Sequence, residues 1–156
     1  MLHIVLHEPD IPANTGNIIR LCANTGAALH LIEPLGFELD DKKLRRAGLD
    51  YHEWAHVQRY SSLNDFIITR QPQRMFALTT KGSSIYSETK FQDGDVLLFG
   101  SETRGLPAET LDSMSADKKL YLPMQASSRS LNLSNTVAIV LFEAWKQLEF
   151  TGGVIK

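Results

Sequence analysis

The sequence lacks the features that several classes of protein require. Cys22 is the only cysteine in 156 residues, so no disulfide can form within the chain. The longest unbroken apolar run, residues 137–142, is far shorter than the roughly 20 residues of a membrane-spanning helix. The first ten residues, MLHIVLHEPD, have neither the basic stretch nor the long apolar stretch of a secretory signal peptide. We therefore expect a cytoplasmic protein without a membrane segment.

An excess of positive charge is also missing. Sixteen Lys and Arg face eighteen Asp and Glu, and the net charge of -2 excludes the overall basic field of many nucleic-acid binders. RNA would have to bind local patches, and Lys42, Lys43, Arg45 and Arg46 form one on a predicted helix. As a rule, such a cluster is simply a solvated helix face. No repeat or Pro/Gly/Ser-rich linker divides the chain, so we expect a single domain over residues 1–156.

Two common nucleotide-binding motifs are absent. The sequence contains no G-x-G-x-x-G, which leaves a dinucleotide site of the Rossmann type unsupported. Gly100 and Gly105 have the spacing of a phosphate-binding loop, but Leu106 and Pro107 replace the required Lys and Ser/Thr. What is left is a strand that ends in Gly100, where a ligand or another backbone could approach closely. An ordinary turn explains this motif equally well.

The segment His52-Glu53-Trp54-Ala55-His56 matches the zinc-protease pattern H-E-x-x-H. That chemistry requires a helix, which brings both imidazoles to one ion. The pattern WAHVQRY predicts a strand instead, in which four residues span about 13 Å. No histidine follows residue 56, so a third ligand would have to be a carboxylate. We therefore expect no metal, with a zinc hydrolase as the alternative.

Short strand-like runs alternate with helix-like segments along the chain. This alternation predicts an α/β fold with a mainly parallel sheet and helices on both faces, whose ligands bind at the carboxyl ends of the strands. The predicted strands cover residues 2–6, 28–32, 54–60, 74–79, 95–99 and 119–122. The predicted helices run from a cap at Asn14 or Thr15 to Asn24, from Asp40 or Asp41 to about Ala47, from Ser62 to Arg70 and from Leu133 to Leu148.

Two of the segments that leave strand ends carry unusual polar residues. Residues 122–135, LPMQASSRSLNLSN, form a Ser-, Asn- and Arg-rich joint much longer than the usual two to six residues. Capping of the last helix by Asn132 or Ser134 explains only part of it. In residues 14–20, NTGNIIR, the charged Arg20 lies among apolar neighbours. A cation in such surroundings usually has a specific anionic partner.

These residues together resemble a known family. The segments NTGNIIR, LLFGSETRGLP and LPM with SRSLNLSN resemble the three motifs of the SPOUT methyltransferases, in the same order and spacing. The resemblance is closest to the TrmL (YibK) group, which consists of little more than the catalytic domain, and it extends over nearly the whole chain. It implies a C-terminal deep trefoil knot, an exception to the rule that chains do not thread loops. It also implies transfer of a methyl group from S-adenosyl-L-methionine to the ribose 2′-hydroxyl of nucleotide 34, a cytidine or modified uridine, in leucine tRNAs.

The resemblance also implies roles for individual residues. Backbone groups near Leu78, Gly100 and Leu122, together with Ser130, would bind the cofactor, although Leu122 replaces a more usual Ile. Arg20 would be the catalytic residue, and because an arginine hardly loses its proton we expect it to orient the hydroxyl or stabilise an alkoxide. The remaining motif residues would have less direct roles. Arg129 would contact RNA. Glu102 and Asn135 would shape the pocket and the contact between subunits.

The chain is too small to hold a separate RNA-binding module, so we expect a homodimer that assembles the tRNA surface from local patches. Two alternatives lie close to this interpretation. One is 2′-O-methylation at another tRNA or rRNA position. The other is an RNA-binding domain that has lost transfer activity, although all three motifs are intact.

Overall fold

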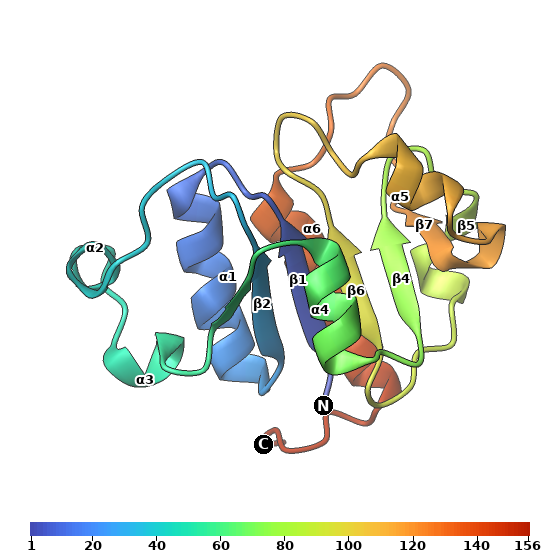
Figure 1. The fold of residues 1–156 in the computed structure, drawn as a ribbon. Helices are drawn as coiled ribbons and strands as arrows, with labels where there is room; N and C mark the ends of the chain where they lie inside the picture. The colour runs from blue at the N-terminus through green and yellow to red at the C-terminus, as the bar shows by residue number, and fades with distance from the viewer.

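The seven strands form one sheet in which every neighbouring pair is parallel, as the sequence predicts (Figure 1). The computed structural model describes residues 1–156. The strand order is β3-β2-β1-β6-β4-β7-β5. The strands are β1 (His3–His7), β2 (Ala28–Ile32), β3 (Gln58–Tyr60), β4 (Met75–Leu78), β5 (Ser84–Ile85), β6 (Val96–Phe99) and β7 (Lys119–Tyr121).

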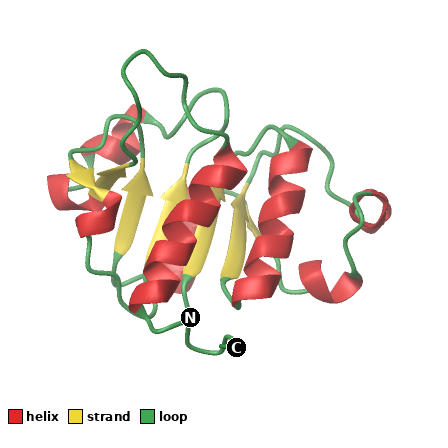
Figure 2. Ribbon diagram, turned by 180° about the vertical axis from the view of Figure 1, so that it is seen from behind, coloured by secondary structure: helices red, strands yellow, loops and turns green.

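Helices cover both faces of the sheet. Helices α4 and α5 lie on the face toward the viewer in Figure 1, and Figure 2 shows α1 and α6 side by side on the other face. None of the helices is long and apolar enough to cross a membrane. The α-helices are α1 (Pro12–Thr25), α2 (Asp41–Arg46), α3 (Tyr51–Trp54), α4 (Leu63–Arg70), α5 (Ala108–Asp112) and α6 (Leu133–Gln147), and the 3-10 turns are η1 (Tyr86–Glu88) and η2 (Ala116–Lys118).

The hydrophobic core has two parts, one on each face of the sheet. Side chains alternate along a strand, so Ile4 and Leu6 of β1 join the larger cluster while Val5 joins the smaller one. The larger cluster contains the buried faces of α1 and α6, and the smaller one contains Phe66 of α4 and Leu111 of α5. A strand buried on both faces must be apolar at every position, which explains the continuous run VLLF in β6.

Several predicted boundaries differ from the structure. Helix α1 begins at Pro12 rather than at a cap on Asn14 or Thr15, because a proline in the first turn needs no hydrogen bond for its nitrogen. The strand predicted over residues 54–60 was wrong at its start: α3 occupies residues 51–54 and β3 only residues 58–60. The short edge strand β5 was not predicted. The caps at Asp40, Ser62 and Asn132 are confirmed, as each side chain accepts a hydrogen bond from the helix that follows.

All strands point in one direction, so the loops after β1, β4, β6 and β7 gather at one edge of the sheet (Figure 1). In a parallel sheet this carboxyl edge is where ligands bind, especially where the chain order reverses. The reversal lies beside β1, whose neighbours are β2 on one side and β6 on the other.

Candidate functional site

A cavity of about 510 Å³ lies at the carboxyl edge of the sheet. Its wall is formed by the ends of β4, β6 and β7 and by the loop that leads into α6. All four residues predicted to bind a cofactor line it, namely Leu78, Gly100, Leu122 and Ser130. The volume is in the range of small-molecule sites, and apolar leucine side chains alternate there with hydroxyl and amide groups. Four residues that are far apart in the sequence therefore meet at one cavity.

Gly100 is the point where the loop after β6 folds back on itself. A Cβ atom at this position would lie 2.2 Å from the carbonyl carbon of Gly105 and 2.4 Å from the nitrogen of Leu106. Both are backbone atoms, which cannot move aside as a flexible side chain can. Gly105 has a φ of 67°, and its N–H donates to the carbonyl oxygen of Ser101 at 3.0 Å. Glycine at position 100 is therefore required by this tight loop, and the close approach predicted from the sequence is made by the protein's own backbone.

A hydrogen-bonded network at the cavity joins one residue from each of the three motif segments. Asn14 of α1 donates from Nδ2 to Oε2 of Glu102 at 3.1 Å, and its Oδ1 accepts from Nδ2 of Asn132 at 3.0 Å. Glu102 also accepts from the backbone N–H groups of Asp10 at 2.9 Å and Ile11 at 2.8 Å. The Oδ1 of Asn132 accepts from the N–H of Ser134 at 2.9 Å and so caps α6. The network fixes the beginnings of α1 and α6 relative to the loop after β6.

Arg20 lies elsewhere. It is not part of the cavity wall just described but lines a second cavity of about 490 Å³ between α1, α2 and the segment of residues 37–39. Its guanidinium donates from Nε to Oε1 of Glu53 at 3.3 Å and from Nη2 to the carbonyl oxygen of Gly48. The anionic partner expected for a cation among apolar neighbours is thus Glu53, in the segment after α2. The side chain of Arg20 is still 50% exposed.

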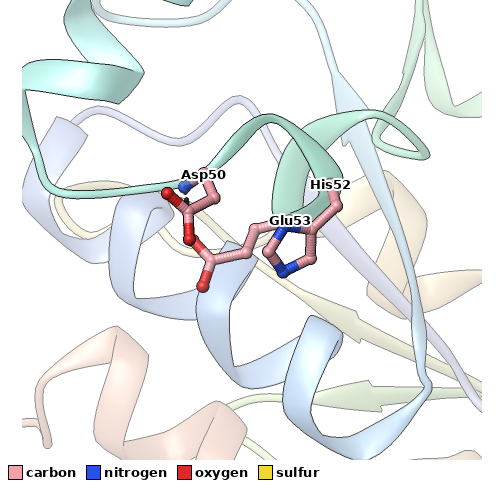
Figure 3. Close-up of side chains that lie close together, drawn as sticks. All are labelled: Asp50, His52 and Glu53. Carbon is pink, nitrogen blue, oxygen red and sulfur yellow. Dashed lines mark hydrogen bonds between the residues drawn. The ribbon is translucent and has the colours of Figure 1, made fainter.

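The H-E-x-x-H segment forms one turn of helix and not the predicted strand. Side-chain ligand atoms of Asp50, His52 and Glu53 lie within 4.8 Å of one another (Figure 3), whereas His56 is not part of this group. Both oxygens of Glu53 already accept hydrogen bonds, Oε1 from Arg20 and Oε2 from the backbone N–H of Asp50 at 2.9 Å. The hydrogen bond from the Asp50 N–H, followed by the hydrogen bond and the charge of Arg20, lowers the pKa of the Glu53 carboxyl, although its partial burial opposes this. Glu53 therefore acts as an anion paired with Arg20.

The sequence matches the SpoU rRNA Methylase family over residues 1–142. The chain belongs to this family. The match spans all the residues that line the two cavities. The family resemblance given by the three sequence motifs is confirmed.

Several known proteins resemble the chain over all or nearly all of its length. It is 59% identical to the tRNA (cytidine(34)-2'-O)-methyltransferase of Escherichia coli strain K12, over 100% of this chain and 99% of that protein. A solved structure from work on the 2-OH methylation of C/U34 on tRNA is 44% identical, with a TM-score of 0.86, over 96% of this chain and 97% of the other. The AdoMet-bound rRNA methyltransferase of Sinorhizobium meliloti is 27% identical, with a TM-score of 0.81, over 94% of this chain and 56% of that one.

Other predicted residues of this family member lie outside the first cavity. Arg129 is exposed in the loop before α6, and the basic residues 42–46 lie on α2, where Lys43 pairs with Glu38 at 2.9 Å. Asn132 lines the cavity, but Asn135 does not. Sequence reasoning considered Asn14 and Asn132 only as helix caps. Nothing in the sequence indicated that these two residues meet, because they lie 118 positions apart in the chain.

Proposed function

We propose that this chain transfers the methyl group of S-adenosyl-L-methionine to the ribose 2′-hydroxyl of nucleotide 34, the wobble nucleotide, of tRNA. The full-length identity of 59% to the E. coli enzyme is the observation that carries this proposal. The substrates would be leucine tRNAs with a cytidine or modified uridine at that position. Because tRNA is found in the cytoplasm, we propose that the reaction takes place there.

The residues of the first cavity fit the cofactor. The ends of three strands offer backbone donors and acceptors near Leu78, Gly100 and Leu122, and Ser130 adds a hydroxyl. The leucine side chains provide an apolar surface for an adenine ring, and the volume of about 510 Å³ suits a ligand of this size. When bound, S-adenosylmethionine supplies an electrophilic methyl group on a sulfonium. The related AdoMet-bound structure from S. meliloti supports the same assignment.

Arg20 would act on the nucleophile. Displacement at a sulfonium methyl group requires the attacking oxygen in line with the bond that breaks, and it develops negative charge on that oxygen as its proton leaves. An arginine hardly gives up its proton, so it serves as a donor and a positive charge rather than as a base. Two of the five N–H donors of a guanidinium are taken by Glu53 and Gly48. The others are left to bind the hydroxyl.

We also propose that residues 1–156 form one domain with the deep trefoil knot expected of these methyltransferases. The long segment between β7 and α6 and the loop after β6 line the same cavity, and Asn132 is tied to Asn14 at the start of α1. These contacts support a knot in which the segment between β7 and α6 is held at the cofactor site. The knot would explain why the joint before α6 is longer than an ordinary connection.

A homodimer is the proposed active form. Arg20 does not line the cavity proposed for the cofactor, so a second subunit could complete the site. Ile139 and Phe142 are exposed on one face of α6, at 39% and 45%, which leaves an apolar surface for a partner copy. Arg129 and the basic patch of α2 would then supply local positive charge for tRNA.

The deciding experiment uses S-adenosylmethionine labelled in the methyl group. Purified protein is incubated with tRNA, and in parallel with rRNA, from cells that lack the modification. The product is digested first to oligonucleotides, which locate the label along the RNA, and then to nucleosides. We expect label in 2′-O-methylcytidine or a 2′-O-methylated uridine derived from position 34, with unchanged activity in the presence of EDTA because the proposed reaction uses no metal. Label in a base, or at another tRNA or rRNA position, would overturn the proposal. Binding of tRNA without transfer would instead indicate the RNA-binding alternative.

A further inference from the structure

The guanidinium of Arg20 has two acceptors within the protein. Glu53 contacts it through Oε1, and the carbonyl oxygen of Gly48 accepts from Nη2. Arg20 lines the second cavity, whereas Glu53 and Gly48 do not. The side chain of Glu53 is only 11% exposed, against 50% for Arg20. In this structure Glu53 is therefore linked to the cavity through its contact with Arg20.

The anchoring of Glu53 is unusually firm for an ion pair near the surface. Its second oxygen, Oε2, accepts from the backbone N–H of Asp50 at 2.9 Å and holds the carboxylate in one orientation (Figure 3). The next residue, Trp54, is 7% exposed and belongs to the larger core cluster, which fixes α3 against α1. Most exposed ion pairs lack such support, since both side chains move freely.

The second acceptor is set by backbone conformation. Gly48 follows α2 and has a φ of 81°, a left-handed value that glycine adopts without strain. Its N–H donates to the carbonyl oxygen of Arg45 at 3.0 Å, and its own carbonyl oxygen faces Arg20. The turn after α2 thus fixes one edge of the guanidinium while Glu53 fixes another.

We propose that Glu53 is a positioning residue for methyl transfer, which together with Gly48 holds the Arg20 guanidinium in the orientation that presents its remaining donors to the substrate hydroxyl. This inference rests on the proposed role of Arg20 and extends it to the H-E-x-x-H segment. In this proposal Glu53 is the orienting carboxylate of the catalytic arginine. A displacement of about 1 Å in a reacting group can cost about 100-fold in rate, so a fixed guanidinium matters.

The test compares Glu53→Gln with a matched control, Glu33→Gln. Glutamine can still accept from the N–H of Asp50 and keep the turn of α3, but its amide NH₂ cannot accept from Arg20. Glu33 pairs with Arg59 at 3.5 Å and lines neither of the two cavities. We expect Glu53→Gln to lower kcat about 10- to 100-fold, with the KM for tRNA and the Kd for S-adenosylmethionine unchanged. Glu33→Gln keeps kcat within about twofold.

Two further measurements separate positioning from a merely structural role. In an Arg20→Lys background, Glu53→Gln is expected to have no further effect on kcat, because it acts through the arginine. An equal loss in both backgrounds would overturn the proposal. The ¹⁵N NMR signal of the Arg20 Nε–H, assigned by its absence in Arg20→Lys, is expected to exchange faster with water in Glu53→Gln than in Glu33→Gln. This signal can be measured without methyl transfer. An unchanged exchange rate would refute the proposal that Glu53 holds the Arg20 guanidinium in place. Lack of methyl transfer by the wild-type protein would refute only the proposed reaction.

Discussion

The carboxylate of Glu102 accepts a hydrogen bond from the backbone N–H of Ile11 at 2.8 Å, although the two residues lie 91 positions apart. Ile11 is the N-cap of α1 and has no side-chain oxygen to satisfy the first donors of this helix. Glu102 supplies the missing acceptor and places a negative charge at the positive end of α1. A loop of the candidate cofactor site therefore caps the helix that carries Arg20.

Replacement of Glu102 by alanine is expected to weaken both the fold and the site. The N–H groups of Asp10 and Ile11 and the amide of Asn14 would lose their acceptor, which costs about 1–3 kcal/mol in the free energy of unfolding. Urea unfolding measures this loss, and calorimetry measures the weaker binding of S-adenosylmethionine. Glu88→Ala, an exposed glutamate, is the control. Equal stability of the two variants would contradict this account of Glu102.

Gly100→Ala tests the tight loop after β6. The added methyl group would meet backbone atoms of Gly105 and Leu106 at 2.2 and 2.4 Å, so the loop must open. We expect a loss of about 3 kcal/mol or more in stability and at least a tenfold weaker binding of S-adenosylmethionine. Gly16→Ala in α1 is the matched control, because the nearest atom, Cδ1 of Leu49, is 4.0 Å away. A helix-interior alanine there should stabilise the protein by up to about 1 kcal/mol.

Arg20→Ala separates catalysis from cofactor binding. Arg20 does not line the cavity proposed for S-adenosylmethionine, so the Kd of the cofactor should change less than about twofold. Methyl transfer should fall by at least about 100-fold, the effect of losing one strong donor to a developing oxyanion. Single-turnover transfer and calorimetry check the two expectations. Equal loss of both properties would show that Arg20 is structural.

The buried side chain of His30 makes the stability of the fold depend on pH. Tyr60 donates to Oε1 of Gln58 at 2.7 Å, so its oxygen accepts from Nδ1 of His30 at 3.1 Å, and Nε2 of His30 accepts from Nδ1 of His3 at 3.0 Å. Burial, aided by the charges of His3 and Arg70, lowers the pKa of His30 from 6.5 to about 3. Between these values the unfolded chain binds a proton that the folded one does not, so stability falls as pH falls below 6.5.

Substitution of glutamine at His30 should remove this part of the pH dependence. Its amide can donate to Tyr60 and its carbonyl can accept from His3, which preserves the buried chain of hydrogen bonds. We expect the slope of unfolding free energy between pH 6 and pH 4 to decrease by roughly 1 kcal/mol per pH unit. Urea unfolding at a series of pH values measures it. His52→Gln, at an exposed histidine, controls for loss of an imidazole, and an unchanged slope in His30→Gln would refute this origin.

Phe142→Glu tests the proposed dimer. A carboxylate on the apolar face of α6 would have to be buried against the partner copy at a cost of several kcal/mol. We expect a monomer in light scattering, with normal far-UV circular dichroism and little methyl transfer. Ile68→Glu on α4 places the same charge on the opposite side of the sheet, where Ile68 is 65% exposed, and should leave the oligomer unchanged. A fully active monomer would refute the need for a second subunit.

Local patterns in the sequence determined most of the fold. Alternating apolar runs specified the parallel sheet and the helices on both faces, and the caps at Asp40, Ser62 and Asn132 fixed helix starts through contacts within three residues. The boundary at residue 54 was predicted wrongly. The β-branched and aromatic residues of WAHVQRY favour a strand, but Asp50 and Glu53, only three residues apart, form a capping box that starts a helical turn. Burial of Trp54 in the core stabilises this turn further, so a local start signal and tertiary packing together outweighed strand propensity.

The sequence by itself also determined the composition of the site: the three motifs, the glycine at position 100 and an arginine in need of an anion. Only the tertiary structure decided which residues meet. It joined Asn14, Glu102 and Asn132 at one cavity and placed Arg20 at another, paired with Glu53. The physical reason is that a hydrogen bond acts over about 3 Å, while its partners here lie 33 to 118 residues apart. Such contacts depend on how the whole chain is folded, and no local pattern encodes them.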